Sequence, residues 1–299
     1  MKVAGSSEHV PLSVEWPTLL LALVIYGGWL AVTAWHALLP WPLMLALGAW
    51  LIAWQGSLQH EVIHGHPTRQ RWLNDAIGFV PLSLWLPYTI YRRDHVAHHA
   101  TDHLTDPFDD TESNYLPQHG GMAHLCAVLE ATLLGRMLFG PPIRLARFWL
   151  GELRRLARDP GGVAWDWLPH LAGVALVLWW LDHVGLPLRT YLLCFVWPGT
   201  SLLLIRSFAE HRASVDPAAR TAIVEDFGPL GLLFLYNNLH VWHHGRPAAP
   251  WYALPALHRA APEAFAQAPR YAGYGEVFAR FAFRAHDALV HPQRGPSRP

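Results

Sequence analysis

The sequence predicts an all-α integral membrane protein with four transmembrane helices in two hairpins and a cytoplasmic helical cap that carries a di-metal histidine site. Three observations support this fold class. Hydrophobic residues make up 52% of the 299-residue chain and charged residues only 15%, against about 25% in an ordinary soluble domain. Two long stretches contain almost no charged residue. Histidines are gathered in three clusters whose spacing fits the face of a helix.

The first hairpin follows from a long uncharged run. No Asp, Glu, Lys or Arg occurs between Glu15 and Glu61. Because one span needs about 20 apolar residues, this run is too long for one helix and long enough for two. Two prolines within residues 40–42 mark the break, so we expect helices at Pro17–Trp35 and Trp41–Gln59. A cleaved signal peptide is a poor alternative, because no small-residue cleavage site follows a short apolar region.

The second hairpin lies within the apolar region Trp167–Ile205, which is interrupted by charged residues around Gly185. We expect its helices at roughly 163–181 and 188–206. Each half has fewer uncharged residues than the about 17 to 25 that a span usually contains.

The region between the two hairpins contains no further full span. Ala76–Tyr91 is apolar but short and broken by prolines, which fits an interfacial or re-entrant segment. Thr101–Tyr115 is rich in Asp and Thr and is expected to be a loop. Ala123–Phe139 is amphipathic, and we expect it to lie along the membrane surface.

The arginines predict the orientation. Residues 36–42 and 182–189 carry almost no basic side chain, whereas 69–93, 144–158 and 206–220 carry many. By the positive-inside rule, the last three segments and both termini face the cytoplasm. All three histidine clusters then fall on that side. The expected domain organisation is an N-terminal tail (1–15), a membrane domain (16–291) and a C-terminal tail (292–299).

The three histidine clusters read H-x-x-x-H, H-x-x-H-H and H-x-x-H-H. They consist of His60 and His64; His95, His98 and His99; and His240, His243 and His244. Residues three and four apart share a helix face, so each H-x-x-H-H box is expected to aim three imidazoles at one point. Imidazole suits Zn, Cu, Fe and Ni, and eight imidazoles are more than one tetrahedral zinc needs. The clusters therefore predict two metal ions.

Charge and cysteine content exclude other classes of protein. The net charge is +0, so nothing indicates a nucleic-acid partner. The two cysteines, Cys126 and Cys194, lie far apart in apolar surroundings, which argues against a disulfide framework or a cysteine zinc site. Two cysteines also cannot hold an iron–sulfur cluster.

These features together resemble the membrane-bound fatty acid desaturases and, more broadly, the integral-membrane di-iron oxygenases that include hydroxylases and carotenoid ketolases. The resemblance covers roughly residues 40–255. It rests on the three boxes in this order, on the four spans, and on residues that flank the third box: Asn238, Leu239, Pro247, Pro250, Trp251 and Tyr252.

The resemblance implies a membrane enzyme with two non-haem irons that uses dioxygen to desaturate the acyl chain of a lipid. Hydroxylation or ketolation is the alternative within the same superfamily. A separate electron donor is implied, either ferredoxin-like or of the cytochrome b type with its reductase. A ninth ligand is implied near the cytoplasmic end of the last span, where this chain has His211. Some relatives have an Asn four residues earlier; Ser207 stands there, and we leave it out of the ligand set.

Further residues are expected around the metal site. Metal-bound histidines usually donate their other ring N–H to a carboxylate or carbonyl. The candidate acceptors are Glu61, Asp94, Asp102, Asp106, Asp109, Asp110 and Glu210. His66 is expected to be a bystander because it lies on a different helical face from His64, and His103 is expected beside the ligands. Ala76–Tyr91 is expected to form the wall of an apolar substrate tunnel, with Gly78 and Ser83 facing the acyl chain.

Two rival interpretations come from other classes of protein. Residues 60–64 also match H-E-x-x-H, the zinc metalloprotease motif with Glu61 as general base. An intramembrane protease would leave both H-x-x-H-H boxes unexplained. A metal carrier or transporter would place its histidines within the spans, along a path, whereas here they lie outside the spans.

Overall fold

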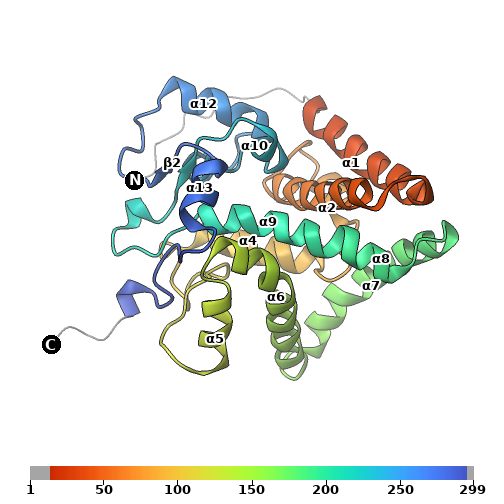
Figure 1. The fold of residues 1–299 in the computed structure, drawn as a ribbon, viewed down its shortest axis with the longest axis horizontal. Coiled ribbons are helices and arrows are strands. Elements are labelled where there is room, and N and C mark those ends of the chain that lie inside the picture. Colours follow the sequence, from red (N-terminus) through yellow and green to blue (C-terminus); the bar gives the residue numbers. More distant parts are fainter. Residues whose placement is uncertain (1–13, 295–299) are drawn as a thin grey trace.

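The computed structural model describes residues 14–294, and its regular secondary structure is almost entirely helical (Figure 1). The described elements are, in chain order, α1 (Trp16–Ala34), η1 (His36–Leu38), α2 (Trp41–Ile63), α3 (Arg71–Phe79), α4 (Tyr88–Ala100), α5 (Gly121–Leu129), α6 (Leu133–Leu156), α7 (Pro160–His183), α8 (Leu188–Tyr191), η2 (Leu192–Val196), α9 (Trp197–Ala209), η3 (Pro217–Ala219), β1 (Ile223–Val224), α10 (Pro229–Leu233), α11 (His240–Gly245), η4 (Trp251–Ala253), α12 (Leu254–Ala260), β2 (Arg270–Tyr271), α13 (Tyr274–Phe281) and η5 (Pro292–Arg294). The only described strands, β1 and β2, form a parallel pair of two residues each. The all-α prediction is confirmed.

The first predicted hairpin is formed by α1 and α2. Both helices have a proline in their first turn, where its missing N–H costs no hydrogen bond. Pro40 has extended backbone angles and separates the two helices. α2 runs to Ile63, four residues beyond the expected end, so that His60 belongs to the same rigid helix as the apolar run.

The second predicted hairpin is formed by α7 and by the continuous helical stretch of α8, η2 and α9. η2 is a single π-helical turn within this stretch. α7 begins at Pro160, three residues earlier than expected, because the Asp159 carboxylate caps it by accepting a hydrogen bond of 2.9 Å from the Gly162 N–H. The stretch ends at Ala209, immediately before Glu210 and His211.

Among the residues that the structure describes, three helices are long and apolar enough to cross a membrane, namely α1, α7 and the stretch Leu188–Ala209. α2 has 23 residues but carries polar side chains in its second half. Gln55 donates to the Val80 carbonyl at 2.9 Å and Gln59 donates to the Gly78 carbonyl at 2.8 Å. α2 packs against α1, α3 and α9, so these polar groups bond to neighbouring protein rather than face lipid.

The two hairpins lie side by side. At the end opposite the histidines, the Trp180 indole donates to the Thr33 hydroxyl at 3.0 Å, and the Trp29 indole donates to the Tyr191 hydroxyl at 3.0 Å. Figure 1 shows both connections at the right-hand end of the view, with α2 and α9 running back towards the left. The ends of α2 and α9 are therefore brought to one side of the molecule.

The segment between the first two histidine boxes folds as α3, a turn, and α4. Gly78 is buried here, and a Cβ atom on it would lie 2.5 Å from Cε2 of Tyr88 and 2.7 Å from Cγ2 of Val62. The prediction that Gly78 faces a substrate tunnel is therefore wrong, because the packing of α3 against α2 and α4 fills that space.

The loop predicted at Thr101–Tyr115 is confirmed, since the structure has only turns and bends there. The amphipathic segment Ala123–Phe139 is divided between α5 and α6, which begins where the Thr132 hydroxyl accepts a hydrogen bond of 3.0 Å from the Gly135 N–H. In the view of Figure 1, α5 and α6 run across the direction of α1, α2 and α9. Of the expected tails, residues 1–13 and 295–299 lie outside the described residues.

Candidate metal centre

The predicted metal ligands come from four places on one side of the fold. His60 lies in the last turn of α2, and His64 caps its end. The second box lies on α4 and the third on α11. His211 follows α9 directly. The ends of the two hairpins thus bring residues from distant parts of the chain together.

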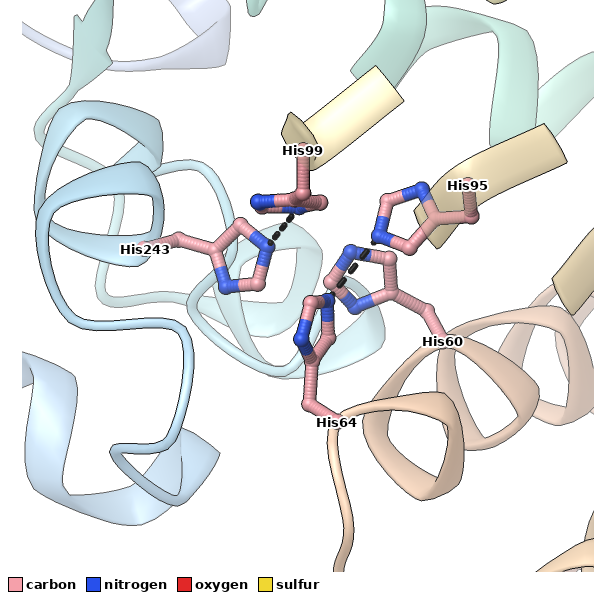
Figure 2. A group of neighbouring side chains, drawn as sticks. All are labelled: His60, His64, His95, His99 and His243. Carbon is pink, nitrogen blue, oxygen red and sulfur yellow. Dashed lines mark hydrogen bonds between the residues drawn. The ribbon is translucent and has the colours of Figure 1, made fainter. Parts of the chain in front are cut away.

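All nine predicted histidines fall into two groups, in each of which one potential ligand atom per residue lies within 4.8 Å of the others. The five-histidine group contains His60, His64, His95, His99 and His243 (Figure 2). The four-histidine group contains His98, His211, His240 and His244. Two groups match the number of metal ions that the sequence predicts.

Each H-x-x-H-H box is shared between the two groups, so the prediction that a box aims all three imidazoles at one point is wrong. His95 and His99 belong to the five-histidine group, whereas His98 belongs to the four-histidine group. In the third box, His243 is likewise separated from its neighbours. Consecutive residues on a helix point about 100° apart, so His98 and His99 diverge, while residues four apart stay on one face.

The ring nitrogens converge within each group. In the five-histidine group, the Nε2 atoms of His64 and His95 lie 2.9 Å apart, and those of His243 and His99 lie 3.0 Å apart. In the four-histidine group, the Nε2 atom of His240 lies 2.9 Å from that of His211 and 3.1 Å from that of His244. These rings therefore present the same nitrogen to the centre of their group.

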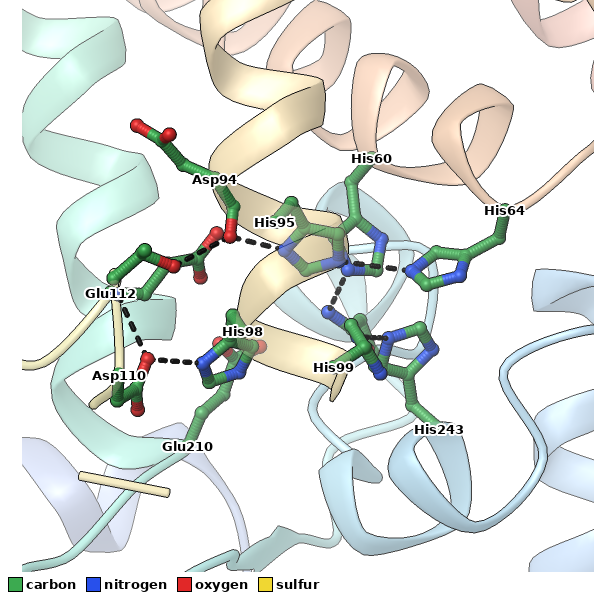
Figure 3. A network of polar contacts seen from close by, with 12 residues as sticks. His60, His64, Asp94, His95, His98, His99, Asp110, Glu112, Glu210 and His243 are labelled. Atoms are coloured by element: carbon green, nitrogen blue, oxygen red, sulfur yellow. Dashed lines mark hydrogen bonds and ion pairs between the residues drawn. The ribbon is translucent and has the colours of Figure 1, made fainter. Parts of the chain in front are cut away.

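The opposite ring nitrogens face acceptors on the outside. The His95 Nδ1–H donates to Glu112 at 2.8 Å, and the His98 Nδ1–H donates to Asp110 at 2.7 Å. Figure 3 shows the Asp110 and Glu112 carboxylates on one side of α4 and His60, His64 and His243 on the other. Such outer contacts fix the tautomer and orientation of a ligating ring.

Of the seven acids expected to accept these hydrogen bonds, two lie beside the histidines. They are Asp110 and Glu210, whose carboxylate lies 3.6 Å from the His240 Nδ1. The other five lie elsewhere. Glu61 accepts a hydrogen bond from the Trp251 N–H at 2.9 Å, and Asp106 accepts one from the Phe108 N–H at 2.9 Å. The Asp94 carboxylate lies 3.6 Å from Arg93. Asp102 and Asp109 are exposed.

Two side chains that contact the histidines, Glu112 and Asn237, were not predicted from the sequence. Glu112 follows Asp110 by two residues in the same loop, a spacing that carries no signal without the loop conformation. Asn237 is buried between the groups: its side-chain oxygen lies 3.3 Å from the His240 Nδ1, and its nitrogen lies 3.3 Å from the His60 Nε2. Its place three residues before the third box, on the same side of that turn, is a signal that could have identified it.

Burial keeps most of these imidazoles neutral. Burial, together with neighbouring imidazoles, lowers the pKa of His64 to about 2, of His99 to about 3 and of His211 to about 4. His98 differs: burial opposes its protonation, but the hydrogen bond to Asp110 and the nearby carboxylates outweigh this and raise its pKa. Neutral imidazoles offer lone pairs to a metal ion.

The geometry of the four-histidine group fits a bound cation. The His211 Nδ1 faces the Arg220 carbonyl oxygen at 3.3 Å, and the His240 Nδ1 faces the Asn237 oxygen, so both Nδ1 atoms carry the hydrogen. Their Nε2 atoms then present lone pairs to each other at 2.9 Å. Two lone pairs at this distance repel unless a cation lies between or beside them, which makes this donor set suitable for a metal ion.

The remaining site residues lie outside both groups. His66 is buried and its Nδ1 contacts Glu15 at 2.7 Å; although burial opposes it, this contact and the charge of Glu61 raise the pKa of His66. His103 is exposed. The Ser207 hydroxyl donates back to the Leu204 carbonyl at 3.4 Å.

Because the Glu61 carboxylate is held by Trp251, it does not point into the five-histidine group, which argues against the metalloprotease interpretation.

Comparison with known proteins identifies a family and a relative that this chain resembles. A family model described as fatty acid desaturase matches residues 33–276, a range that includes all nine histidines. Zeaxanthin 4-ketolase from Chlamydomonas reinhardtii is 25% identical over 272 residues, which cover 85% of this chain and 53% of that protein. The chain therefore spans about half the length of the curated relative that it matches.

Proposed function

The chain belongs to the fatty acid desaturase family, and on this basis we propose that it is a membrane di-iron oxidoreductase that uses dioxygen and external electrons to desaturate the acyl chain of a lipid. The observation that supports this most directly is the arrangement of nine histidines in groups of five and four at one end of two helical hairpins. Two adjacent metal sites made only of imidazole are poorly explained by a protease or a carrier.

The nine proposed ligands are His60, His64, His95, His98, His99, His211, His240, His243 and His244. Imidazole suits iron, and non-haem iron with dioxygen supplies the oxidising power to break an unactivated C–H bond. The protein contributes the geometry. Asp110 and Glu112 hold the outer N–H groups of two ligands on α4, so that the inner nitrogens keep their lone pairs directed at the group.

We propose four spans, with α2 as the fourth beside the three helices that satisfy length and apolar composition. The polar side chains of its second half bond to the protein, so they do not oppose insertion. The proposed membrane domain is 16–291. The arginine-rich segments favour a cytoplasmic location for the metal site and both termini.

Hydroxylation or ketolation is the alternative reaction, and the similarity to a zeaxanthin ketolase favours keeping it open. Desaturation, hydroxylation and ketolation all begin with hydrogen abstraction and differ in the later steps. Each requires an electron donor, which we propose to be a separate ferredoxin or a cytochrome of the b type with its reductase. The cysteines of the described chain, Cys126 and Cys194, are free and far too few for a built-in cluster.

Two measurements test this function. Purified protein is expected to carry about two iron ions per chain, since two groups of ligands are present. Stoichiometric zinc without iron would instead favour the protease. Lipid and pigment profiles of a host with and without the gene identify the product: a new double bond in an acyl chain supports desaturation, whereas a new keto or hydroxyl group supports the alternative.

A further inference from the structure

A pocket of about 560 Å³ opens between the end of α2, α3 and the start of α4. Four arginines line it: Arg69, Arg71, Arg92 and Arg93. His64 of the five-histidine group lines the same pocket, together with the apolar side chains of Val62, Ile63 and Val96. The volume lies within the range of small-molecule sites, about 300 to 1,000 Å³.

The arginines are only partly neutralised by carboxylates. Asp75 is the single acid in the pocket, and both Arg71 and Arg92 lie 3.7 Å from it. Arg93 is paired with Asp166 at 2.9 Å. Within residues 14–294, no ion pair is found for Arg69, which is exposed. The pocket therefore keeps an excess of positive charge.

The positive-inside rule explains why arginines lie near the ends of spans, but it does not explain why they share one concavity. Arg92 is an example that the rule does not explain. Its side chain is only 21% exposed and lines the pocket beside the five-histidine group instead of extending into solvent. Guanidinium groups bind phosphate and carboxylate through paired, charge-assisted hydrogen bonds. An acyl chain has no group that would use this charge; an anionic head group does.

We propose that this pocket binds the phosphate or carboxylate head group of an anionic lipid, with Arg69 and Arg92 as its main contacts. This inference rests on the proposed function and deepens it, since it assigns the substrate to anionic amphiphiles rather than to uncharged polyenes. The apolar residues next to the arginines match the start of a hydrocarbon chain, and His64 places the pocket at the five-histidine group.

The test begins with binding, which needs no turnover. Dodecyl phosphate, inorganic phosphate and dodecanol are titrated into the purified metal-loaded protein in an uncharged detergent, by calorimetry. We expect dodecyl phosphate to bind more tightly than either of the others. Arg69→Gln and Arg92→Gln are each expected to weaken it about tenfold or more, because a charge-assisted hydrogen bond is lost. Arg259→Gln, at an exposed position on α12, is the matched control and should leave binding unchanged.

The outcomes separate this proposal from its rivals. Equal binding of inorganic and dodecyl phosphate would indicate a free-anion site and overturn it. If Arg69→Gln and Arg92→Gln leave lipid binding unchanged but raise the KM for the electron-donor protein, the pocket docks that donor instead. Oxidation of uncharged lipids without binding of dodecyl phosphate would refute this inference alone. Binding of dodecyl phosphate without oxidation of any lipid would refute the proposed function alone.

Discussion

The Nε2 atoms of His211 and His240 face each other at 2.9 Å, although both Nδ1 atoms are already engaged with acceptors. His211 follows the second hairpin and His240 begins α11, so this contact joins the end of α9 to α11. It places His211 in the same group as three histidines of the H-x-x-H-H boxes.

Replacing His211 by Ala is expected to lower the iron content and to abolish turnover, because it removes one of four donors in its group. Iron per chain and product formation are measured together. His66→Ala should keep most of the iron and activity, since His66 lies in neither group. The reverse pattern, an active His211→Ala and an inactive His66→Ala, would show that the ninth ligand is assigned wrongly.

Asp110→Ala is expected to reduce turnover or metal affinity about 10- to 100-fold, the usual cost of losing an outer partner of a metal-bound histidine. Asp110 accepts the His98 Nδ1–H at 2.7 Å, and its loss frees that ring to rotate or change tautomer. Asp109→Ala is the matched control, because Asp109 is adjacent and exposed. Equal effects of the two variants would count against a specific role for Asp110.

Gly78→Ala is expected to destabilise the protein by about 1 to 3 kcal/mol, the usual cost of overpacking a core. The added Cβ would meet Tyr88 and Val62 at less than 3 Å. Gly27→Ala is the control, because nothing lies within 4 Å of the Cβ position in the middle of α1. Thermal unfolding in detergent measures both variants. A stable Gly78→Ala protein that accepts only shorter acyl chains would restore the tunnel-wall prediction.

Asp287 predicts a pH-dependent contribution to stability. Its burial alone would raise its pKa, but the hydrogen bond with His286 and the charge of Arg212 outweigh this and lower the pKa to about 2. Because the folded value lies below the ordinary value of 3.8, the carboxylate stabilises the fold above pH 4, and this is lost as the pH falls towards 2. Asp287→Asn should therefore cost about 2 kcal/mol at neutral pH and progressively less below pH 4. A cost that is constant from pH 7 to pH 3 would contradict this assignment.

The orientation can be tested with single cysteines at Leu38 and Asp182, which are exposed at the ends of the two hairpins. The background replaces Cys126 and Cys194 by Ser. Both new cysteines are expected to react with a membrane-impermeant thiol reagent on intact cells, because the arginine-poor connections face outward. Protection of either one until the cells are lysed would place that connection in the cytoplasm and contradict the four-span topology.

Several features could be predicted from the sequence because they depend on local chemistry. The uncharged run before Glu61 and the prolines at 40–42 determine the first hairpin, and α1 and α2 begin within one residue of the expected positions. The histidine spacing identifies eight of the nine histidines that come together, and the family resemblance implied the ninth, His211. The family was recognisable from the same boxes, and the matched range, 33–276, is wider than the predicted one.

Other features depend on how helices pack, which residue spacing does not specify. The division of each H-x-x-H-H box between two groups depends on how α4 and α11 are placed relative to each other, so that residues on adjacent faces of one helix meet different partners. Glu112 and Asn237 reach the histidines only through the shape of a loop and a turn. Gly78 could have faced a cavity or a neighbouring helix, and the close approach of Tyr88 decided this. The sequence by itself determined which side chains are available as ligands and which segments are apolar enough to form the hairpins; the tertiary structure alone decided which lone pairs face each other, because that depends on distances between residues far apart in the chain.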